Sequence, residues 1–574
     1  MNEYIVTCKS YEDLENFYDD METPGGSLYI PNRSVDLVER RTISRNTHYM
    51  LTEEEAIEIS KDERVISCER TAKDRFIEPE SFWTQTADFN KTLYTFASDD
   101  KNWGLYRMVK GETYTIGGNP VWGNDSTYPG PELTNETIST TASGKNVDVI
   151  IVDDHVLSDH PEFAVNPDGT GGSRVNQINW FQYSSALGYS TNANYSYSFG
   201  GNHGTHVAGT VAGNTQGWAR DATIYNMAFS DSLSGVTDWS EKLWDYIRYF
   251  HNNKAINPAT GRRNPTVVNN SWGSSYPQHI VKTEHAISVT YRGSTTNLSG
   301  YTEAQKKVAL EAGGCSVGNY AFNDVGEDDF RGRVPAQSTS MEADITDAIN
   351  DGVIIVASAG NSYWNCEESG GPDYNNYISV YRNDSFYIYN FDIYHNRGSY
   401  PGSAPGVISV GNIGAKKLEH KNASSNWGGR VDIWAPGSDI ISAIYTNTSS
   451  TLGYTPIVQD FRNSSYYLAS ISGTSMSSPQ ITGILACLAE QEPNLTQAEA
   501  LQHLIENSLS DVHDPGGAAN QQPYEGFGDS LNRYAFIPKK RLDDGMASPA
   551  QLHKNRNSTT TGVKYPRVRY QTTS

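Results

Sequence analysis

The sequence lacks the features that define several large classes of protein. Five cysteines in 574 residues are too few for a disulfide framework or a zinc cluster. No apolar run approaches the roughly 18 residues of a membrane-spanning helix, and the N-terminus lacks a basic segment followed by an apolar one. Lysine and arginine number 44 against 67 acidic residues, so the net charge is −23 and a phosphate-reading surface is disfavoured. We therefore expect neither a membrane nor a nucleic-acid partner, and no secretory signal is visible.

Charge is distributed unevenly along the chain. From Lys539 onward eight basic residues stand against two acidic ones, so the tail carries +6 and the remainder −29. The tail is rich in Ser, Thr, Asn and Gln and has no apolar periodicity. We predict a flexible basic arm over 539–574.

The N-terminal segment predicts a small α+β unit. Helical spacing of apolar residues indicates a helix that Ser10 caps and that runs to about Glu22. Thr52 followed by Glu55 forms a capping box for a second helix over about 53–61. Short apolar runs predict four strands, which gives the βαββαβ order of a ferredoxin-like fold: Tyr4–Cys8, Ser27–Ile30, Thr47–Leu51 and Val65–Cys68.

The rest of the chain predicts a larger α/β domain. Residues 77–99 show no clear period and are interpreted as a linker. From about 100 to 538 short apolar runs alternate with helical patterns, as in βαβ units. The runs Val147–Val152 and Val353–Val356 have the composition of central parallel strands buried on both faces.

Three blocks of this domain carry residues suited to nucleophilic chemistry. Asp153 ends a buried strand, where α/β folds place their sites, although many strands end in Asp as a plain turn residue. His203 opens a small-residue helix and is placed as a general base; alternatives are a core histidine or, with His206, a metal site. Ser475 precedes a buried apolar helix whose positive end favours developing negative charge, and Pro479 suits the first helical turn.

These blocks resemble the Asp, His and Ser motifs of the subtilisin-like serine proteases, in that family's chain order. The His block runs His203–Gly209 and the Ser block Gly473–Pro479. The short loop 213–219 is similar to the proteinase K-like branch. The resemblance implies a subtilisin-like α/β fold with a mostly parallel sheet, and a serine endopeptidase with Asp153, His203 and Ser475 as its triad.

The resemblance also assigns the remaining site residues. Asn361 resembles the family's oxyanion donor. Two neighbouring segments resemble those that bind the substrate backbone by β-augmentation: Ser271, Trp272, Gly273, Ala359 and Gly360. Peptides or proteins are the implied substrates. The chemistry requires no cofactor, and a structural calcium ion stays open because the 213–219 loop is short; the metal ligands are unknown.

The second half of the N-terminal unit, His48 to Arg70, resembles the family's inhibitory propeptide, which implies a propeptide-like domain over residues 1–76. Its implied roles are intramolecular inhibitor and folding aid, with Glu69–Phe76 entering the active site. An alternative of another class is a structural or particle-associated protein that retains the protease fold with an uncleaved N-terminal unit. The absence of a visible signal leaves localisation unknown: an intracellular enzyme, a particle-associated enzyme and one secreted by another route are all compatible with the sequence.

Several features depart from the family pattern. His155 stands where the family usually has Gly, which would be strained if that backbone needs positive φ. The Asp153–Asp154 pair resembles the kexin branch, in which Asp154 would face a basic substrate residue. Insertions are expected near 277–337 and 363–401, and the tyrosines of the second insertion would pack an added lobe, form an interaction surface or pack within the loop.

Overall fold

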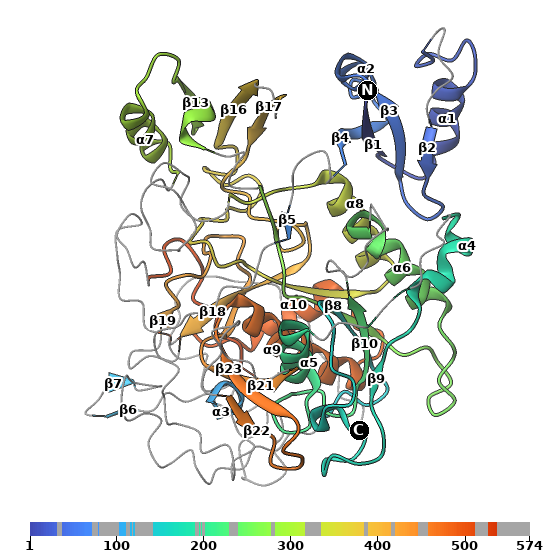
Figure 1. Ribbon diagram of the computed structural model, residues 1–574, viewed down its shortest axis with the longest axis vertical. Coiled ribbons are helices and arrows are strands. Elements are labelled where there is room, and N and C mark those ends of the chain that lie inside the picture. The colour runs from blue at the N-terminus through green and yellow to red at the C-terminus, as the bar shows by residue number, and fades with distance from the viewer. Residues whose placement is uncertain are drawn as a thin grey trace, which may run out of the picture.

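The computed structural model consists of a small N-terminal module, residues 1–71, that lies against a larger body (Figure 1). The predicted basic arm and most of the predicted linker fall outside the residues that the structure describes. Among the described helices, none combines the length and the apolar character needed to cross a bilayer. The described residues are 1–30, 37–71, 78–79, 103–110, 115–116, 119–120, 142–189, 195, 197, 201–228, 239–276, 282–315, 334–383, 388–414, 420–445, 457–510, 512 and 526–536.

The module is a four-stranded antiparallel sheet in the order β2-β3-β1-β4, with two helices. The first and last strands are neighbours, as the βαββαβ pattern predicts. Thr52 and Glu55 make the predicted capping box at the start of α2. The bounds are β1 Asn2–Cys8, α1 Leu14–Glu22, β2 Leu37–Arg40, β3 Asn46–Leu51, α2 Glu53–Ile59 and β4 Val65–Arg70.

Two local predictions in the module are wrong. Ser27–Ile30 is not a strand, because the amide of Leu28 bonds to the Asp20 carbonyl at the end of α1; Leu37–Arg40 pairs with β3 instead. The first helix begins at Leu14 and not at Ser10, whose hydroxyl donates to Asp13 (2.8 Å). Both outcomes depend on hydrogen bonds within short turns, and apolar periodicity does not report such bonds.

The body is built on one sheet with the order β19-β18-β15-β11-β8-β10-β9, and β20 pairs with β18. All pairs are parallel except β18 with β19. Both predicted central runs form buried strands. The bounds are β8 Asp148–Asp153, β9 Val175–Asn176, β10 Thr223–Ala228, β11 Thr266–Asn270, β15 Ile354–Ser358, β18 Ile408–Gly414, β19 His420–Lys421 and β20 Ile433–Pro436.

Helices bury both faces of this sheet. Val149 and Ile151 of β8 share one core with α5 (Asn202–Ala212) and α9 (Thr474–Gln491). Ile150 and Val152 face the opposite way, into a core with α6 (Trp239–Asn253) and α8 (Thr339–Asn350). Alternate residues of one strand therefore serve two cores, which explains why the run is apolar throughout. Helix α10 (Gln497–Glu506) also covers the sheet.

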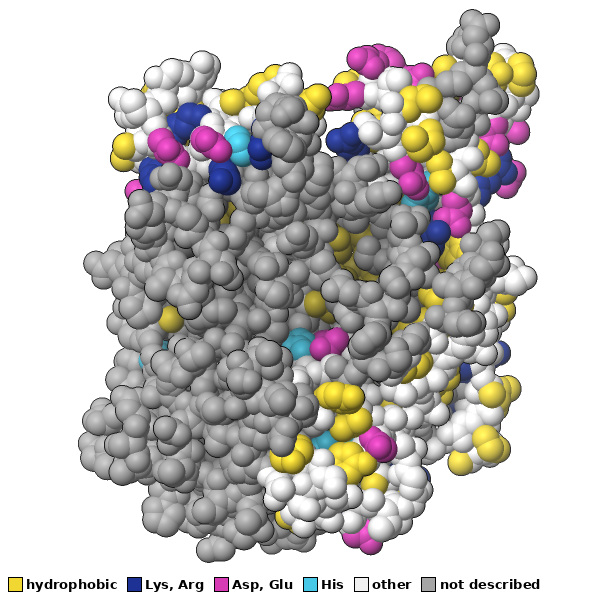
Figure 2. Space-filling view, in the orientation of Figure 1, with side chains coloured by type: hydrophobic (Ala, Val, Ile, Leu, Met, Phe, Trp, Pro, Cys, Tyr) yellow, Lys and Arg dark blue, Asp and Glu magenta, His cyan; other side chains and the backbone are white. Residues whose placement is uncertain are grey.

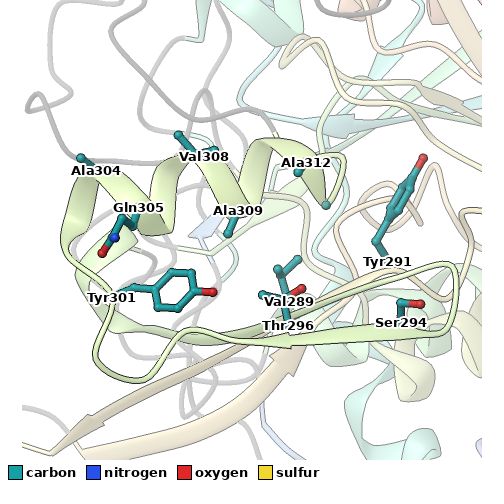
Figure 3. Close-up of a pocket in the computed structure, with 11 residues that line it drawn as sticks. Val289, Tyr291, Ser294, Thr296, Tyr301, Ala304, Gln305, Val308, Ala309 and Ala312 are labelled. Carbon is teal, nitrogen blue, oxygen red and sulfur yellow. The ribbon is translucent and has the colours of Figure 1, made fainter.

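The two segments predicted to be insertions together form one added lobe. Its sheet has the order β14-β13-β16-β17 and a core of its own, with the helix α7 packed on β13. An open groove between α7 and the β13–β14 hairpin has a volume of about 730 Å³. Residues of this lobe line it (Figure 3). The bounds are β13 Ala286–Tyr291, β14 Ser294–Asn297, α7 Glu303–Ala312, β16 Tyr377–Asn383 and β17 Ile388–Ile393.

A three-stranded sheet, β21-β23-β22, lies against α5, and the remaining elements are short. These elements are β21 Ile440–Ile444, β22 Ile457–Gln459, β23 Tyr467–Ile471, α3 Trp103–Lys110, α4 Ser184–Leu187, β5 Glu78–Pro79, β6 Thr115–Ile116, β7 Asn119–Pro120, β12 Ser274–Ser275 and the 3-10 turns Pro161–Phe163, Trp180–Tyr183 and Thr283–His285.

Candidate active site

The side chains of Asp153 and His203 contact each other, in the geometry of a buried ion pair, at the carboxyl edge of the sheet. Asp153 is the last residue of β8, and His203 lies in the first turn of α5. His203 Nδ1 and Asp153 Oδ1 are 2.6 Å apart. Burial opposes the imidazolium, but the neighbouring Asp153 carboxylate outweighs burial and raises the pKa of His203 above its ordinary 6.5. The contact with Asp153 fixes the orientation of the His203 ring through Nδ1. The second ring nitrogen, Nε2, therefore faces away from Asp153.

Ser475 is the second residue of α9, so its hydroxyl lies at the positive end of an 18-residue helix. The hydroxyl donates to the Ser271 carbonyl (3.0 Å). Helices α5 and α9 cross closely, because Gly483 leaves no side chain against the Val211 carbonyl. This close contact packs the helix that carries His203 against the helix that carries Ser475.

Pro479 is the sixth residue of α9, not part of its first turn as predicted. A proline lacks the amide that would bond to the carbonyl four residues earlier, which here is that of Ser475. The Ser271 hydroxyl donates to that carbonyl instead, at 2.8 Å. Ser271 therefore contacts Ser475 twice, through its own carbonyl and its own hydroxyl. A proline four residues after Ser475 indicates, from sequence alone, that the Ser475 carbonyl needs a donor from outside the helix.

Asn361 is held in place by Thr474, a residue that sequence reasoning missed. The Asn361 side-chain oxygen accepts from the Thr474 amide (2.9 Å) and hydroxyl (3.0 Å). Since the oxygen is engaged there, the side-chain NH₂ points away from Thr474. An amide donor beside the N-terminus of α9 can stabilise an oxyanion formed at Ser475.

The five residues predicted to bind substrate backbone divide into two groups. Ala359 donates its amide to Val410, and Gly360 donates its amide to the Thr474 hydroxyl. Their amides are therefore engaged within the protein. Their carbonyl oxygens are engaged as well, because Ala359 accepts from the Asn426 side chain (2.7 Å) and Gly360 from the Asn426 amide (2.9 Å). Ser271, Trp272 and Gly273 lead directly into β12, whose edge pairs with another strand, as described below.

Asp154 points under the first turn of α5, which contradicts the expectation that it faces a substrate. Its carboxylate accepts from the Gly204 amide, and its own amide donates to Asp153 Oδ1 (2.8 Å). Gly201 and Gly204 leave the space that this carboxylate occupies. Burial, followed by repulsion from Asp153, raises the pKa of Asp154 to about 7. Asp154 therefore anchors the helix that carries His203.

The other histidines near the site are structural. His206 Nε2 donates to the carbonyls of Ile440 (2.9 Å) and Ala469 (3.2 Å), and burial lowers its pKa to about 3. His155 keeps a negative φ, so its position carries no left-handed strain, and its ring packs edge-on against Tyr197. Within the described ranges no cluster of three His, Cys, Asp or Glu side chains is arranged to hold a metal ion.

Comparisons with known proteins agree with this geometry. Residues 144–528, about two thirds of the chain, match the subtilase family of peptidases, S8. Alkaline protease 1 of Aspergillus clavatus is 24% identical over 434 residues, covering 75% of this chain and 72% of that protein. Subtilisin-like protease 3 of Arthroderma benhamiae is 24% identical over 443 residues, covering 76% of each.

Solved structures of low sequence identity are also similar. A cold-adapted subtilisin-like serine proteinase is 19% identical with a TM-score of 0.42, covering 78% of this chain and 100% of that one. Fervidolysin from Fervidobacterium pennivorans is 16% identical with a TM-score of 0.47, covering 93% of this chain and 60% of that one. From the family match, the chain belongs to the subtilase family and is a subtilisin-like serine endopeptidase.

Proposed function

We propose that this endopeptidase hydrolyses peptide bonds with the triad Asp153, His203 and Ser475, and that it is made as a zymogen inhibited by its own N-terminal module. The observation that carries the proposal is the 2.6 Å contact between His203 and Asp153, together with a serine at the N-terminus of α9, the helix that packs against α5. The proposed domains are a propeptide-like module over 1–76, a linker over 77–99, a peptidase domain over 100–538 and a basic tail over 539–574.

In the proposed mechanism the Ser475 hydroxyl turns from the Ser271 carbonyl toward His203. Oγ attacks the substrate carbonyl as His203 takes its proton, and Asp153 stabilises the imidazolium. Asn361 and the Ser475 amide stabilise the oxyanion. His203 then protonates the leaving amine, and water repeats the sequence on the acyl-enzyme to regenerate Ser475.

The contacts between module and body support a role for the module in inhibition. Glu69, in β4, accepts from the amides of Thr339 (3.3 Å) and Ser340 (2.6 Å) at the start of α8. A carboxylate at this position satisfies amides that the helix itself leaves unbonded and interacts favourably with its positive end. Figure 2 shows charged side chains of both signs, with apolar ones between them, on the outer surface of the module over α1 and α2.

The chain that leaves the module passes the predicted substrate-binding segment. Strand β5 pairs antiparallel with β12, with Pro79 opposite Ser274 and Glu78 opposite Ser275. Ser274 directly follows Gly273, so this part of the linker adds a strand at the edge proposed to bind substrate. The prediction that Glu69–Phe76 fills that role is corrected in part: Glu69 and Arg70 belong to β4, and residues 72–77 lie outside the described ranges.

The proposed mechanism predicts a pH profile. Because His203 must be neutral to accept the proton and its pKa is raised, kcat/KM should fall on the acid side through a pKa above 6.5. The Asp154 carboxylate also raises the pKa of His203, so Asp154→Asn should move this limb to lower pH while its amide oxygen still accepts from Gly204. The measurement is kcat/KM against pH.

The matched control for this prediction is Asp159→Asn. It removes an exposed carboxylate that accepts a hydrogen bond from the Tyr466 hydroxyl. Its profile should coincide with that of the unmodified enzyme. A rate that is flat between about pH 5 and 8, or a limb that moves to higher pH in Asp154→Asn, contradicts the assignment.

Maturation is tested by sequencing the N-terminus of purified protein. We expect active material to begin after Pro79 and before Trp103, and Ser475→Ala protein to keep Met1. Met1 on all active material would exclude a zymogen. Protein that keeps Met1, hydrolyses no peptide and assembles into particles would instead support the structural alternative.

A further inference from the structure

Glu162 holds the short loop that follows α5. The amides of Thr215 and Gln216 donate to Glu162 Oε2 (3.0 and 3.1 Å), and the Thr215 hydroxyl donates to Oε1 (2.5 Å). Glu162 itself lies in the 3-10 turn Pro161–Phe163 and is fully buried. In family members with a longer loop, the resemblance associates this part of the fold with calcium. These residues could bind a metal ion only if their oxygens were not already accepting hydrogen bonds from cationic side chains.

Arg462 faces Glu162 from the loop between β22 and β23. Its guanidinium donates to Glu162 Oε1 and to Asp460 Oδ2 (2.6 Å), and its Nε donates to Asp460 Oδ1 (3.0 Å). Arg462 is 4% exposed at its side chain, and both carboxylates are 0% exposed. The hydrogen bonds from Arg462 hold the pKa of Asp460 below its usual value despite burial. The fourth acceptor position of Glu162 is therefore occupied by a cation that belongs to the chain.

Arg174 occupies the neighbouring set of oxygens. Its guanidinium donates to four backbone carbonyls and one side-chain amide oxygen, which come from the turn near 162–164, the end of α5, the loop and the residue just before β10. Burial lowers the pKa of Arg174 to about 10, so the group stays charged at neutral pH. The acceptors are the carbonyls of Glu162 (3.1 Å), Ala164 (3.2 Å), Ala212 (2.7 Å) and Ala222 (3.2 Å) and Asn214 Oδ1 (3.2 Å).

These residues do not fit a calcium ion. Calcium takes six to eight oxygen ligands at about 2.3–2.6 Å. Here the converging oxygens already accept from guanidinium groups, and the two carboxylates are balanced by two arginines, so a divalent ion would add uncompensated positive charge. We propose that Arg174 and Arg462 form an arginine brace that replaces a metal ion and holds the loop after α5 without calcium.

The position of the brace connects it to the active site. Helix α5 carries His203 in its first turn and ends at Ala212, whose carbonyl is the shortest contact of Arg174. The brace thus fixes one end of the helix whose other end Asp154 anchors. A protein with this arrangement keeps that helix in place in surroundings that contain little calcium.

Hydrogen exchange of the full-length chain tests the proposal, in a Ser475→Ala background that prevents self-digestion. Peptides covering 160–167 and 212–219 are followed in excess EDTA and in excess calcium chloride. We expect identical exchange in the two conditions. Faster exchange of these peptides in EDTA, or slower exchange in calcium, would overturn the proposal, and because the readout is local, a calcium site elsewhere would not mimic it.

Substitutions provide the second arm. Arg174→Met and Arg462→Met remove charge and donors while keeping an elongated side chain, and each should speed exchange in 212–219 by about tenfold or more. Arg220→Met is the control, since Arg220 makes one bond to the Gly217 carbonyl in the same loop. Unchanged exchange in both brace variants would contradict the proposal. The result does not depend on the proposed catalytic roles, because no turnover is measured.

Discussion

Replacing Ser475 with alanine is expected to lower kcat by about 10⁶-fold, the loss that a cooperating Ser–His–Asp triad shows when its serine is removed. The hydroxyl is the proposed nucleophile, and the Asn361 and backbone donors that remain act only on an oxyanion. KM should change little, because the alanine removes no substrate contact. The measurement is hydrolysis of a chromogenic peptide. Both proteins carry an external protease site within 80–99, so that the module can be released from each.

The matched control is Ser477→Ala, which removes a hydroxyl two residues away on the same helix. Ser477 donates to the Ala435 carbonyl (3.2 Å) and has no proposed catalytic role. We expect its kcat to stay within about threefold of the unmodified enzyme, because one buried hydrogen bond affects stability more than chemistry. Comparable activity in Ser475→Ala and the unmodified enzyme would contradict the triad.

Replacing Arg41 with methionine is expected to release the module from the body. Arg41 lies just after β2, and its fully buried guanidinium bridges Asp245 of α6 and Asp344 of α8, at 2.8 Å to each. Burial and the nearby Asp245 raise the pKa of Asp344 to about 7, while Arg41 opposes this rise. Removing one partner of a buried ion pair costs about 3–5 kcal/mol because the other charges stay unpaired. The docking equilibrium should therefore shift by about 10²- to 4 × 10³-fold.

Hydrogen exchange measures this shift in the Ser475→Ala full chain. The Ser340 amide, which donates to Glu69 of the docked module, should exchange faster in Arg41→Met by the same factor. Arg40→Met is the control, because Arg40 is 42% exposed at its side chain and pairs with Glu22 inside the module. Its exchange should change less than about fivefold. Equal exchange at Ser340 in both variants would show that the buried ion pair does not hold the module.

The sequence predicted the parts of the fold that local pattern encodes. The apolar run Val147–Val152, the capping box at Thr52 and the small residues of the His block each specify one element by periodicity or by a fixed interval. The subtilisin-like α/β fold is confirmed by the family match and the mostly parallel sheet. The insertions near 277–337 and 363–401 were expected, but not their assembly into one four-stranded sheet, because pairing between β13 and β16 has no local signal.

The contacts that sequence reasoning missed join residues far apart in the chain. Nothing in the local sequence pattern marks Arg41, yet it is buried against Asp245 and Asp344. The pair Asp153–Asp154 resembled another branch of the family, which predicted that Asp154 faces a substrate. The structure shows that its carboxylate lies instead in the space left by Gly201 and Gly204. Burial of a charged group depends on which segments meet, and composition does not report that.

The most direct test of the central claim is covalent labelling with a fluorophosphonate followed by mass mapping of the labelled peptide. We predict one adduct per chain, on Ser475, in processed enzyme, with none in Ser475→Ala or in the unmodified enzyme at a pH well below the pKa of His203. No labelling in any processing state, or an adduct on a different serine, would contradict the proposed triad.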